Sequence, residues 1–158
     1  MRVALVTISD SVARGAREDR SGPALREQCQ TLGWQVVSSH VVPDEVSSLQ
    51  ARLIELIDSA LVDVVLTTGG TGIGPRDTTP EATLAVCDKV IPGLGELMRE
   101  KGRQATPRAA LSRAIAGVRG RALIVNLPGS PKGARESLAA IADLIPHALE
   151  VLRGARHD

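Results

Sequence analysis

The fold is decided by the stretch VVLTTGGTGIGPRD, which spans residues 64–77. Residues 64–68 are β-prone and mostly apolar, which predicts a strand. The glycine-rich segment 69–74 follows this strand without a break. Thr79-Pro80-Glu81 then predicts the start of a helix, with an N-cap, a proline at the first helical position and an acidic first turn. A strand, a glycine-rich loop and a helix in this order predict an α/β protein.

The same alternation continues on both sides of this stretch. We expect further strands at 3–8, 36–42 and 122–125, where β-branched and aliphatic residues gather. We expect helices at 21–33, 49–60, 92–101 and 138–152, the last with a bend at Pro146 and a stop at Gly154.

The segment 102–120 is basic and polar, and we expect part of it to be strand. Strands that alternate with helices favour a sheet whose strands are mostly parallel. The sequence therefore predicts a single domain over residues 1–158. Its expected architecture is a three-layer α/β sandwich with a mostly parallel central sheet and helices on both faces.

Composition limits the classes of function. The chain has 158 residues, of which 43% are hydrophobic, and this fits one domain with a substantial core. Trp34 is the only large aromatic side chain, and a formal net charge of +1 argues against a nucleic-acid partner. No apolar run approaches the roughly 20 residues of a membrane span, and Met1-Arg2 leads directly into a strand rather than a signal peptide. We expect a cytoplasmic protein that binds neither nucleic acid nor membrane.

The cysteines and histidines do not form the pattern of a metal centre. Cys29 and Cys87 lie far apart in segments that we expect to be helical, and free cysteines tend to be buried. His40, His147 and His157 are scattered over a strand, a helix and the tail. We therefore expect the cysteines to pack in the interior, and we expect neither a zinc site nor a histidine-centred triad.

Four unusual loops follow strands of the expected sheet. They are Ser9-Asp10, Pro43-Asp44-Glu45, residues 69–77 and residues 126–132. If these strands are parallel, the four loops emerge at the carboxyl edge, where open α/β sheets bind ligands. One polar loop is commonly a solvated turn, but four at one edge predict a binding site.

The glycine-rich loop suits an anion but belongs to neither common phosphate motif. It lacks the Gly-Lys-Ser/Thr end of a Walker loop, and Pro75 stands where a dinucleotide fingerprint requires glycine. Residues without a Cβ let backbone N–H groups approach anionic oxygen atoms and adopt left-handed conformations. We expect Gly69, Gly70 and Gly72 to bind phosphate, with the Thr71 hydroxyl as a further donor. The alternative is a simple turn between strand and helix.

Asp44 and Asp77 are the candidate ligands of Mg²⁺, which prefers hard oxygen atoms and is commonly held by one or two carboxylates plus substrate phosphates. The alternative is that Asp44 forms an Asx turn and that Asp77 is a turn or cap residue.

Two basic features accompany these loops. The segment from Arg14 to Arg20 either closes over a triphosphate or is a solvated charged loop. Lys132 lies near the start of the last helix, where a cation opposes the helix dipole unless an anion is close.

In order along the chain, the motifs resemble those of the molybdopterin adenylyltransferases of molybdenum cofactor biosynthesis. The motifs are TTGGTG (67–72), PRD (75–77), TPEAT (79–83), PG (92–93), LSR (111–113), AG (116–117) and NLPGSPK (126–132). The resemblance extends from Val3 to about Gly154. It implies a homotrimer that transfers AMP from Mg-ATP to the terminal phosphate of molybdopterin and releases pyrophosphate. It also implies that the product passes to a molybdate-inserting molybdenumtransferase.

The resemblance also assigns site residues. Asp44 and Asp77 match the essential aspartates of the family. The ligand-contacting positions are matched by Ser9, Asp19, Thr71, Ser112, Asn126 and Ser130. The expected substrate site further includes Pro128, Gly129 and Lys132. Gly102 stands where some relatives carry a serine near the ligand.

Two other functions compete with this interpretation. The first is a module or scaffold of the same fold that binds molybdopterin without chemistry, and the retained Asp44 and Asp77 argue against it. The second is a nucleotide-binding oxidoreductase, which lacks its glycine fingerprint here.

Overall fold

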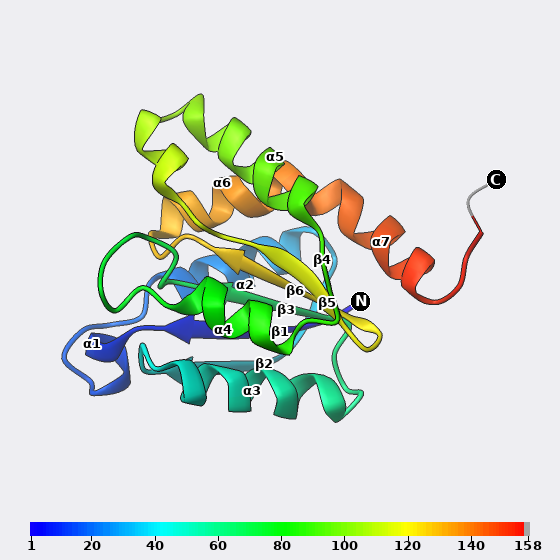
Figure 1. Ribbon diagram of the computed structural model, residues 1–158, viewed down its shortest axis with the longest axis horizontal. Coiled ribbons are helices and arrows are strands. Elements are labelled where there is room, and N and C mark those ends of the chain that lie inside the picture. The colour runs from blue at the N-terminus through cyan, green and yellow to red at the C-terminus, as the bar shows by residue number, and fades with distance from the viewer. Residues whose placement is uncertain (157–158) are drawn as a thin grey trace.

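The central sheet has four parallel strands and an antiparallel pair at one edge. In the computed structural model, which describes residues 1–156, its order is β2-β1-β3-β6-β5-β4 (Figure 1). The strands are β1 (Arg2–Ile8), β2 (Gln35–Val42), β3 (Val64–Thr68), β4 (Lys89–Val90), β5 (Ala116–Arg119) and β6 (Ala122–Leu127). β1 pairs in parallel with β2 and β3, and β3 pairs in parallel with β6. β5 pairs antiparallel with β6, and β4 pairs antiparallel with β5.

Helices cover both faces of this sheet (Figure 1). The α-helices are α1 (Asp10–Ala13), α2 (Ser21–Thr31), α3 (Val46–Asp58), α4 (Thr79–Val86), α5 (Pro92–Arg103), α6 (Pro131–Ile141) and α7 (Ile145–Leu152). Two 3₁₀ helices are η1 (Pro107–Leu111) and η2 (Ala142–Leu144). The predicted three-layer α/β fold with a mostly parallel sheet is confirmed.

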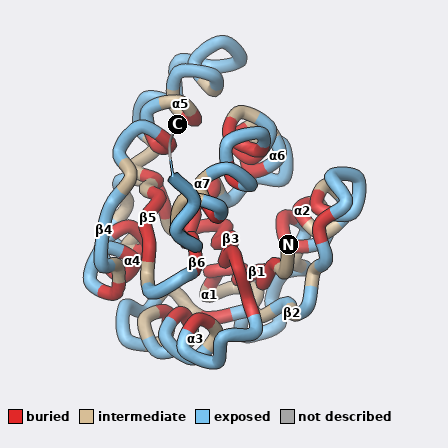
Figure 2. Tube along the Cα trace, turned by 90° about the vertical axis from the view of Figure 1, so that its right-hand side faces the viewer, coloured by how far each residue is buried: buried red, intermediate tan, exposed pale blue. Residues whose placement is uncertain are grey.

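Two hydrophobic layers follow from the alternation of side chains along each strand. Val64 and Leu66 of β3 pack toward α2, α5, α6 and α7, whereas Val65 between them packs toward α3 and α4. Figure 2 shows the buried residues concentrated in the central strands and on the inward sides of the helices. Each fully buried aliphatic side chain contributes about 1.5–3 kcal/mol relative to an exposed one. These layers hold the strand ends, and therefore the loops, in fixed positions.

Most expected elements are present, and two details were wrong. The last helix is not one bent helix, because η2 separates α6 from α7 and Pro146 lies in the first turn of α7. Proline is tolerated there because its missing N–H is not needed in a first turn. Thr79 is not the N-cap of α4: Thr78 holds that position, and the Thr79 hydroxyl donates to the Gly69 carbonyl at 2.8 Å.

The remaining sequence expectations concern single segments. Part of 102–120 is indeed strand, namely β5, whereas the two-residue strand β4 had no sequence signal. Cys29 is buried in the core, and burial raises the pKa of its thiol to about 11. Cys87 is half-buried just after α4 rather than inside it.

His157 lies outside the described residues. No helix within 1–156 combines the length and apolarity needed to cross a membrane.

A buried carboxylate fastens both ends of the chain at the amino edge of the sheet. Asp63 accepts hydrogen bonds from the backbone N–H of Arg2 at 2.7 Å and from Nη2 of Arg153 at 3.0 Å. Burial alone would raise the pKa of Asp63, but hydrogen bonds from Arg2 and the charges of Arg2 and Arg153 outweigh it and lower the pKa to about 2. The ionised carboxylate therefore stabilises the folded state.

We predict that Asp63→Asn lowers the free energy of unfolding by roughly 1–2 kcal/mol at pH 7, since both arginines are partly solvent-screened. Because the folded pKa lies below the ordinary 3.8, this contribution is present above that value and is lost as the pH falls toward 2. Urea unfolding across this range checks it, with Asp143→Asn as a control at an exposed carboxylate. A difference between variant and wild type that does not shrink below about pH 4 would contradict this role.

Candidate functional site

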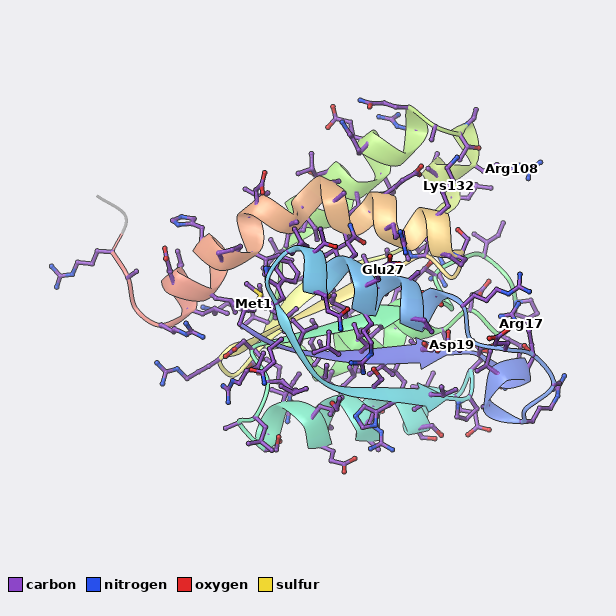
Figure 3. All side chains as sticks on the ribbon, turned by 180° about the vertical axis from the view of Figure 1, so that it is seen from behind. Met1, Arg17, Asp19, Glu27, Arg108 and Lys132 are labelled. Carbon is purple, nitrogen blue, oxygen red and sulfur yellow. The ribbon has the colours of Figure 1, made fainter. Side chains whose placement is uncertain are left out.

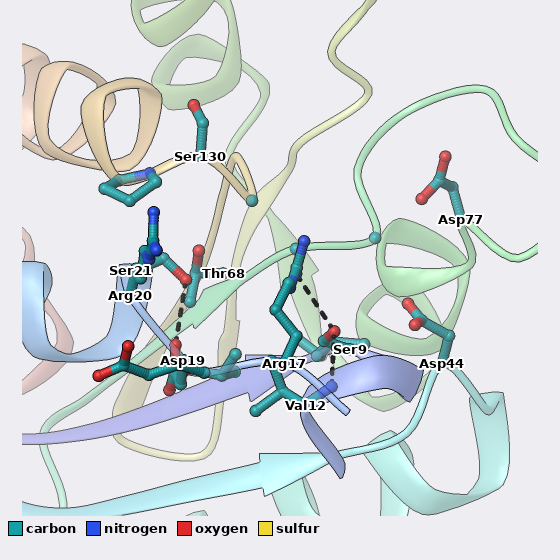
Figure 4. Close-up of a pocket in the computed structure, with 17 residues that line it drawn as sticks. Ser9, Val12, Arg17, Asp19, Arg20, Ser21, Asp44, Thr68, Asp77 and Ser130 are labelled. Carbon is teal, nitrogen blue, oxygen red and sulfur yellow. Dashed lines mark hydrogen bonds between the residues drawn. The ribbon is translucent and has the colours of Figure 1, made fainter. Parts of the chain in front are cut away.

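A cavity of about 690 Å³ lies at the carboxyl edge of the sheet. Its wall includes residues from the loops after all four parallel strands: Ser9, Asp44, Gly69, Gly70, Asp77, Gly129 and Ser130. Because these strands run in the same direction, their carboxyl ends share one edge and their loops meet there. Figure 4 shows Asp44 and Asp77 on one side of the cavity and Asp19, Arg20 and Ser21 on the other. The expected convergence of loops is therefore present.

The start of the glycine-rich loop requires glycine. Gly69 and Gly70 have φ angles of +103° and +68°, in the region that side chains with a Cβ rarely adopt. A Cβ on Gly69 would collide with the Ile8 carbonyl oxygen, and one on Gly70 would collide with the Thr79 hydroxyl. The loop therefore lies directly against β1 and α4.

In four consecutive peptide groups of this loop, the C=O accepts a hydrogen bond and the N–H donates none within residues 1–156. The carbonyl oxygens of Gly69, Gly70, Thr71 and Gly72 accept, in turn, the Thr79 hydroxyl, the Thr79 N–H, the Arg113 N–H and the Arg113 Nε. Within the described chain, the following N–H groups donate to no other group of the protein: Gly70, Thr71, Gly72 and Ile73. In a planar trans peptide the N–H points away from the C=O. Four consecutive free donors thus form a surface suited to an anion.

Asp44 is fixed by an exchange of hydrogen bonds with Asp10. The Asp44 N–H donates to Oδ1 of Asp10 at 2.9 Å, and the Asp10 N–H donates to Oδ2 of Asp44 at 2.8 Å. Arg76 donates to both oxygen atoms of Asp10 at 3.0 Å, and these bonds lower the pKa of Asp10. Burial raises the pKa of Asp44, and the negative charges of Asp10 and Asp77 add to that rise. A cation beside Asp44 would relieve this repulsion.

Asp77 is held by the backbone of its own loop. Its Oδ2 accepts the Gly74 N–H at 2.8 Å, and a Cβ on Gly72 would lie 2.8 Å from the same oxygen. Oδ1 of Asp44 and Oδ1 of Asp77 accept no hydrogen bond within residues 1–156. In the same range, no three His, Cys, Asp or Glu side chains gather as a metal cluster. The two aspartates thus fit Mg²⁺ only if substrate or water oxygen atoms complete its ligands.

Ser9 and Asp19, two other predicted residues, line the cavity and also brace helices. Ser9 accepts the Val12 N–H at 3.3 Å and caps α1. Asp19 accepts the Thr7 hydroxyl at 2.8 Å and the Gly22 N–H at 3.0 Å, at the start of α2. These hydrogen bonds fix the orientation in which the Ser9 and Asp19 side chains line the cavity.

The arginine-rich loop supplies the cations on the cavity wall. Arg17 and Arg20 line the cavity, whereas Arg14 does not. Both side chains extend from this loop into the space below Ser130 (Figure 4), and Arg17 donates to the Ser9 hydroxyl at 3.4 Å. Their guanidinium groups could hold phosphate oxygen atoms.

A second, more apolar cavity of about 300 Å³ adjoins the first. Four of the predicted residues line this cavity instead: Thr71, Gly72, Ser112 and Pro128. Ser130 borders both cavities, so they share part of one wall. Gly102 also lines the second cavity, where a Cβ would lie 2.8 Å from the Cβ of Ala109. A side chain at position 102 would therefore need Ala109 to shift.

The structure does not bring Asn126 or Lys132 to either cavity. The fully buried Asn126 amide donates to the hydroxyls of Thr67 and Thr83 at 3.0 and 2.9 Å, because this position of β6 faces α4. Lys132 extends into solvent at 82% exposure and lies 3.9 Å from Glu136 (Figure 3). Asn126 braces the sheet beneath the glycine loop, and Lys132 points away from the site.

Three residues that position the site were not predicted as such from the sequence. Asp10 braces Asp44, Arg113 binds the glycine loop, and the Thr68 hydroxyl donates to the Pro128 carbonyl at 2.7 Å. Asp10 had a signal, since it follows β1 beside Ser9. Arg113 and Thr68 lie in the LSR and TTGGTG motifs, but their roles had no signal, because their partners are backbone carbonyls distant in sequence.

Comparisons with known proteins agree with this geometry. Residues 4–147 match the family model described as a probable molybdopterin binding domain. The chain is 41% identical over 156 residues to a molybdopterin adenylyltransferase of Helicobacter pylori J99, covering 98% of this chain and 89% of the relative. It is 38% identical to the Escherichia coli K12 molybdopterin adenylyltransferase, covering 98% and 86%.

A solved structure agrees with these sequence matches. The molybdopterin biosynthesis enzyme MoaB of Thermus thermophilus superposes with a TM-score of 0.91 and 49% identity, and the match covers 99% of both chains. The family model, the sequence relatives and the solved structure all point to proteins of molybdopterin biosynthesis. The chain therefore belongs to the molybdopterin-binding domain family of molybdenum cofactor biosynthesis, together with these molybdopterin adenylyltransferases.

Proposed function

We propose that this protein is a molybdopterin adenylyltransferase, which transfers AMP from ATP to the terminal phosphate of molybdopterin. One structural observation carries the proposal: the run of free backbone N–H groups that starts at Gly70 begins in the cavity lined by Asp44 and Asp77 and continues through Thr71 and Gly72 along the adjoining cavity. The names of relatives at 38–41% identity over nearly the full chain support the same activity. The roles of the individual site residues are proposed from their positions around the cavity.

The reaction forms one bond and breaks one. An oxygen of the pterin phosphate attacks the α-phosphorus of ATP, the bond between the α-phosphorus and its bridging oxygen breaks, and pyrophosphate leaves with that electron pair. The attacking group is itself a phosphate anion, so no protein nucleophile is needed. Catalysis then depends on positioning and on stabilising the charge that develops.

The chain offers groups for each of these tasks. The free N–H groups from Gly70 to Ile73 are oriented before substrate arrives and would stabilise negative phosphate oxygen atoms. Arg17 and Arg20 would bind the polyphosphate from the arginine-rich loop. Asp44 and Asp77 would hold Mg²⁺, which neutralises polyphosphate charge. Since Ser130 borders both cavities, the two phosphate groups would meet near it.

The finer features rest on the family resemblance. We infer that Mg-ATP is the adenylyl donor, that the active form is a homotrimer in the cytoplasm, and that adenylylated molybdopterin passes to a molybdenumtransferase. Exposed apolar side chains such as Ile73, Leu84 and Leu111 are consistent with contacts between copies.

We predict that Asp77→Ala lowers turnover by more than about 10²-fold, because it removes a charged group at the transferring phosphate. The assay supplies molybdopterin and Mg-ATP and measures pyrophosphate, with circular dichroism to check the fold. Asp143→Ala, at an exposed carboxylate, should retain wild-type turnover. Near-normal activity of Asp77→Ala would refute the assigned role. Tight pterin binding by the wild type without any pyrophosphate would favour a non-catalytic binding protein.

Asp44→Asn should raise the Mg²⁺ concentration needed for half-maximal turnover, because an amide is a weaker ligand than a carboxylate. The loss of a negative charge next to Asp10 also removes repulsion, so the variant should fold at least as stably as the wild type. Magnesium titrations at saturating ATP check the metal requirement. An unchanged titration curve would count against Asp44 as a metal ligand.

A further inference from the structure

Arg113 joins three parts of the chain around the glycine loop. It lies between η1 and β5, and its Nε donates to the Gly72 carbonyl at 2.8 Å. Its Nη2 donates to the Asp77 carbonyl at 2.7 Å, and its backbone N–H donates to the Thr71 carbonyl at 2.8 Å. One residue thus holds both ends of the segment between Thr71 and Asp77.

The remaining edge of the guanidinium is also occupied. Nη1 forms a close ion pair with the Glu81 carboxylate in the first turn of α4, and this bond lowers the pKa of Glu81. A guanidinium presents its donors in a rigid planar fork, whereas a lysine ammonium is a single point charge. Only arginine can serve the two loop carbonyls and the helix carboxylate together.

These contacts determine which way the loop peptides face. Arg113 holds the carbonyls of Thr71, Gly72 and Asp77, so the opposite sides of those peptides carry the N–H groups of Gly72, Ile73 and Thr78. Two of these, Gly72 and Ile73, belong to the run of free donors described above. If Arg113 released the carbonyls, the peptides could rotate and the donors would lose their common direction.

Arg113 acts on both cavities without lining either one. Gly72 belongs to the wall of the apolar cavity and Asp77 to the wall of the polar cavity, and the Arg113 side chain is absent from both linings. Its influence on a ligand must therefore pass through the loop.

We propose that Arg113 is a positioning residue, which fixes the free amides of the glycine loop and the Asp77 segment relative to each other and so aligns the two cavities for adenylyl transfer. The catalytic part of this inference rests on the proposed function. The structural part does not, because the loop can be observed without substrate.

Arg119 provides a matched control. It forms the same kinds of bond, an ion pair with Asp58 at 3.0 Å and a hydrogen bond to the Val86 carbonyl at 3.1 Å. It lies on β5 and lines neither cavity. Arg119→Ala therefore removes comparable surface bonds and should leave turnover unchanged.

The experiment compares kcat and KM for Arg113→Ala, Arg113→Lys and Arg119→Ala. We expect kcat of Arg113→Ala to fall about 10- to 100-fold, the scale of a misplaced catalytic group, while KM for ATP changes less. Arg113→Lys should be intermediate. Millimolar guanidinium should restore part of the rate of Arg113→Ala and should not accelerate Arg119→Ala. If Arg113→Ala does not fold, wild-type kcat in Arg113→Lys would overturn the proposal.

A second measurement separates failure of this proposal from failure of the proposed function. Backbone ¹⁵N order parameters are recorded for residues 70–78 without substrate. We expect them to fall in Arg113→Ala, toward the range of flexible backbone below about 0.6, and to match the wild type in Arg119→Ala. Unchanged order parameters in Arg113→Ala would overturn the positioning role. An inactive wild type with this loss of order would refute only the adenylyl-transfer function.

Discussion

The orientation of four peptide groups in the glycine loop is the constraint on which the site depends. Their carbonyl oxygens are bonded to Thr79 and Arg113, and their N–H groups remain free. The hydrogen bonds from Thr79 and Arg113 and the close approach of Gly69 to the Ile8 carbonyl hold the loop in this orientation. The parallel strands bring the other loops to the same edge, and the two hydrophobic layers keep that edge rigid.

Charge is distributed unevenly around this edge, and the distribution suits a polyphosphate with a cation. Asp10 is neutralised by an ion pair with Arg76, whereas Asp44 forms no ion pair within residues 1–156 and burial raises its pKa. Of the positive charges on the wall, Arg20 lies across the cavity from Asp44 and Asp77, and Arg17 lies between them beside Ser9 (Figure 4). In the proposed reaction the two aspartates would hold the metal ion, and the two arginines would bind phosphate oxygen atoms.

The sequence predicted the architecture well because it depends on repeating patterns. Alternating apolar runs and helical spacing located nearly every strand and helix, and the parallel order then implied that Ser9, Asp44 and Asp77 share an edge. Side-chain direction was not predictable in the same way. Asn126 belongs to a motif that suggests ligand contact, but the pleat of β6 turns it toward Thr67 and Thr83. Arg113 has no periodic signature, because its partners are carbonyl oxygens more than thirty residues away.

The most direct test of this account is an NMR titration of the protein with Mg²⁺ and a non-hydrolysable α,β-methylene analogue of ATP. The amide signals of Gly70, Thr71, Gly72 and Ile73 should shift downfield as their N–H groups gain phosphate acceptors. Binding of the analogue, measured in parallel by calorimetry, that leaves these four amides unshifted while other signals move would contradict the account.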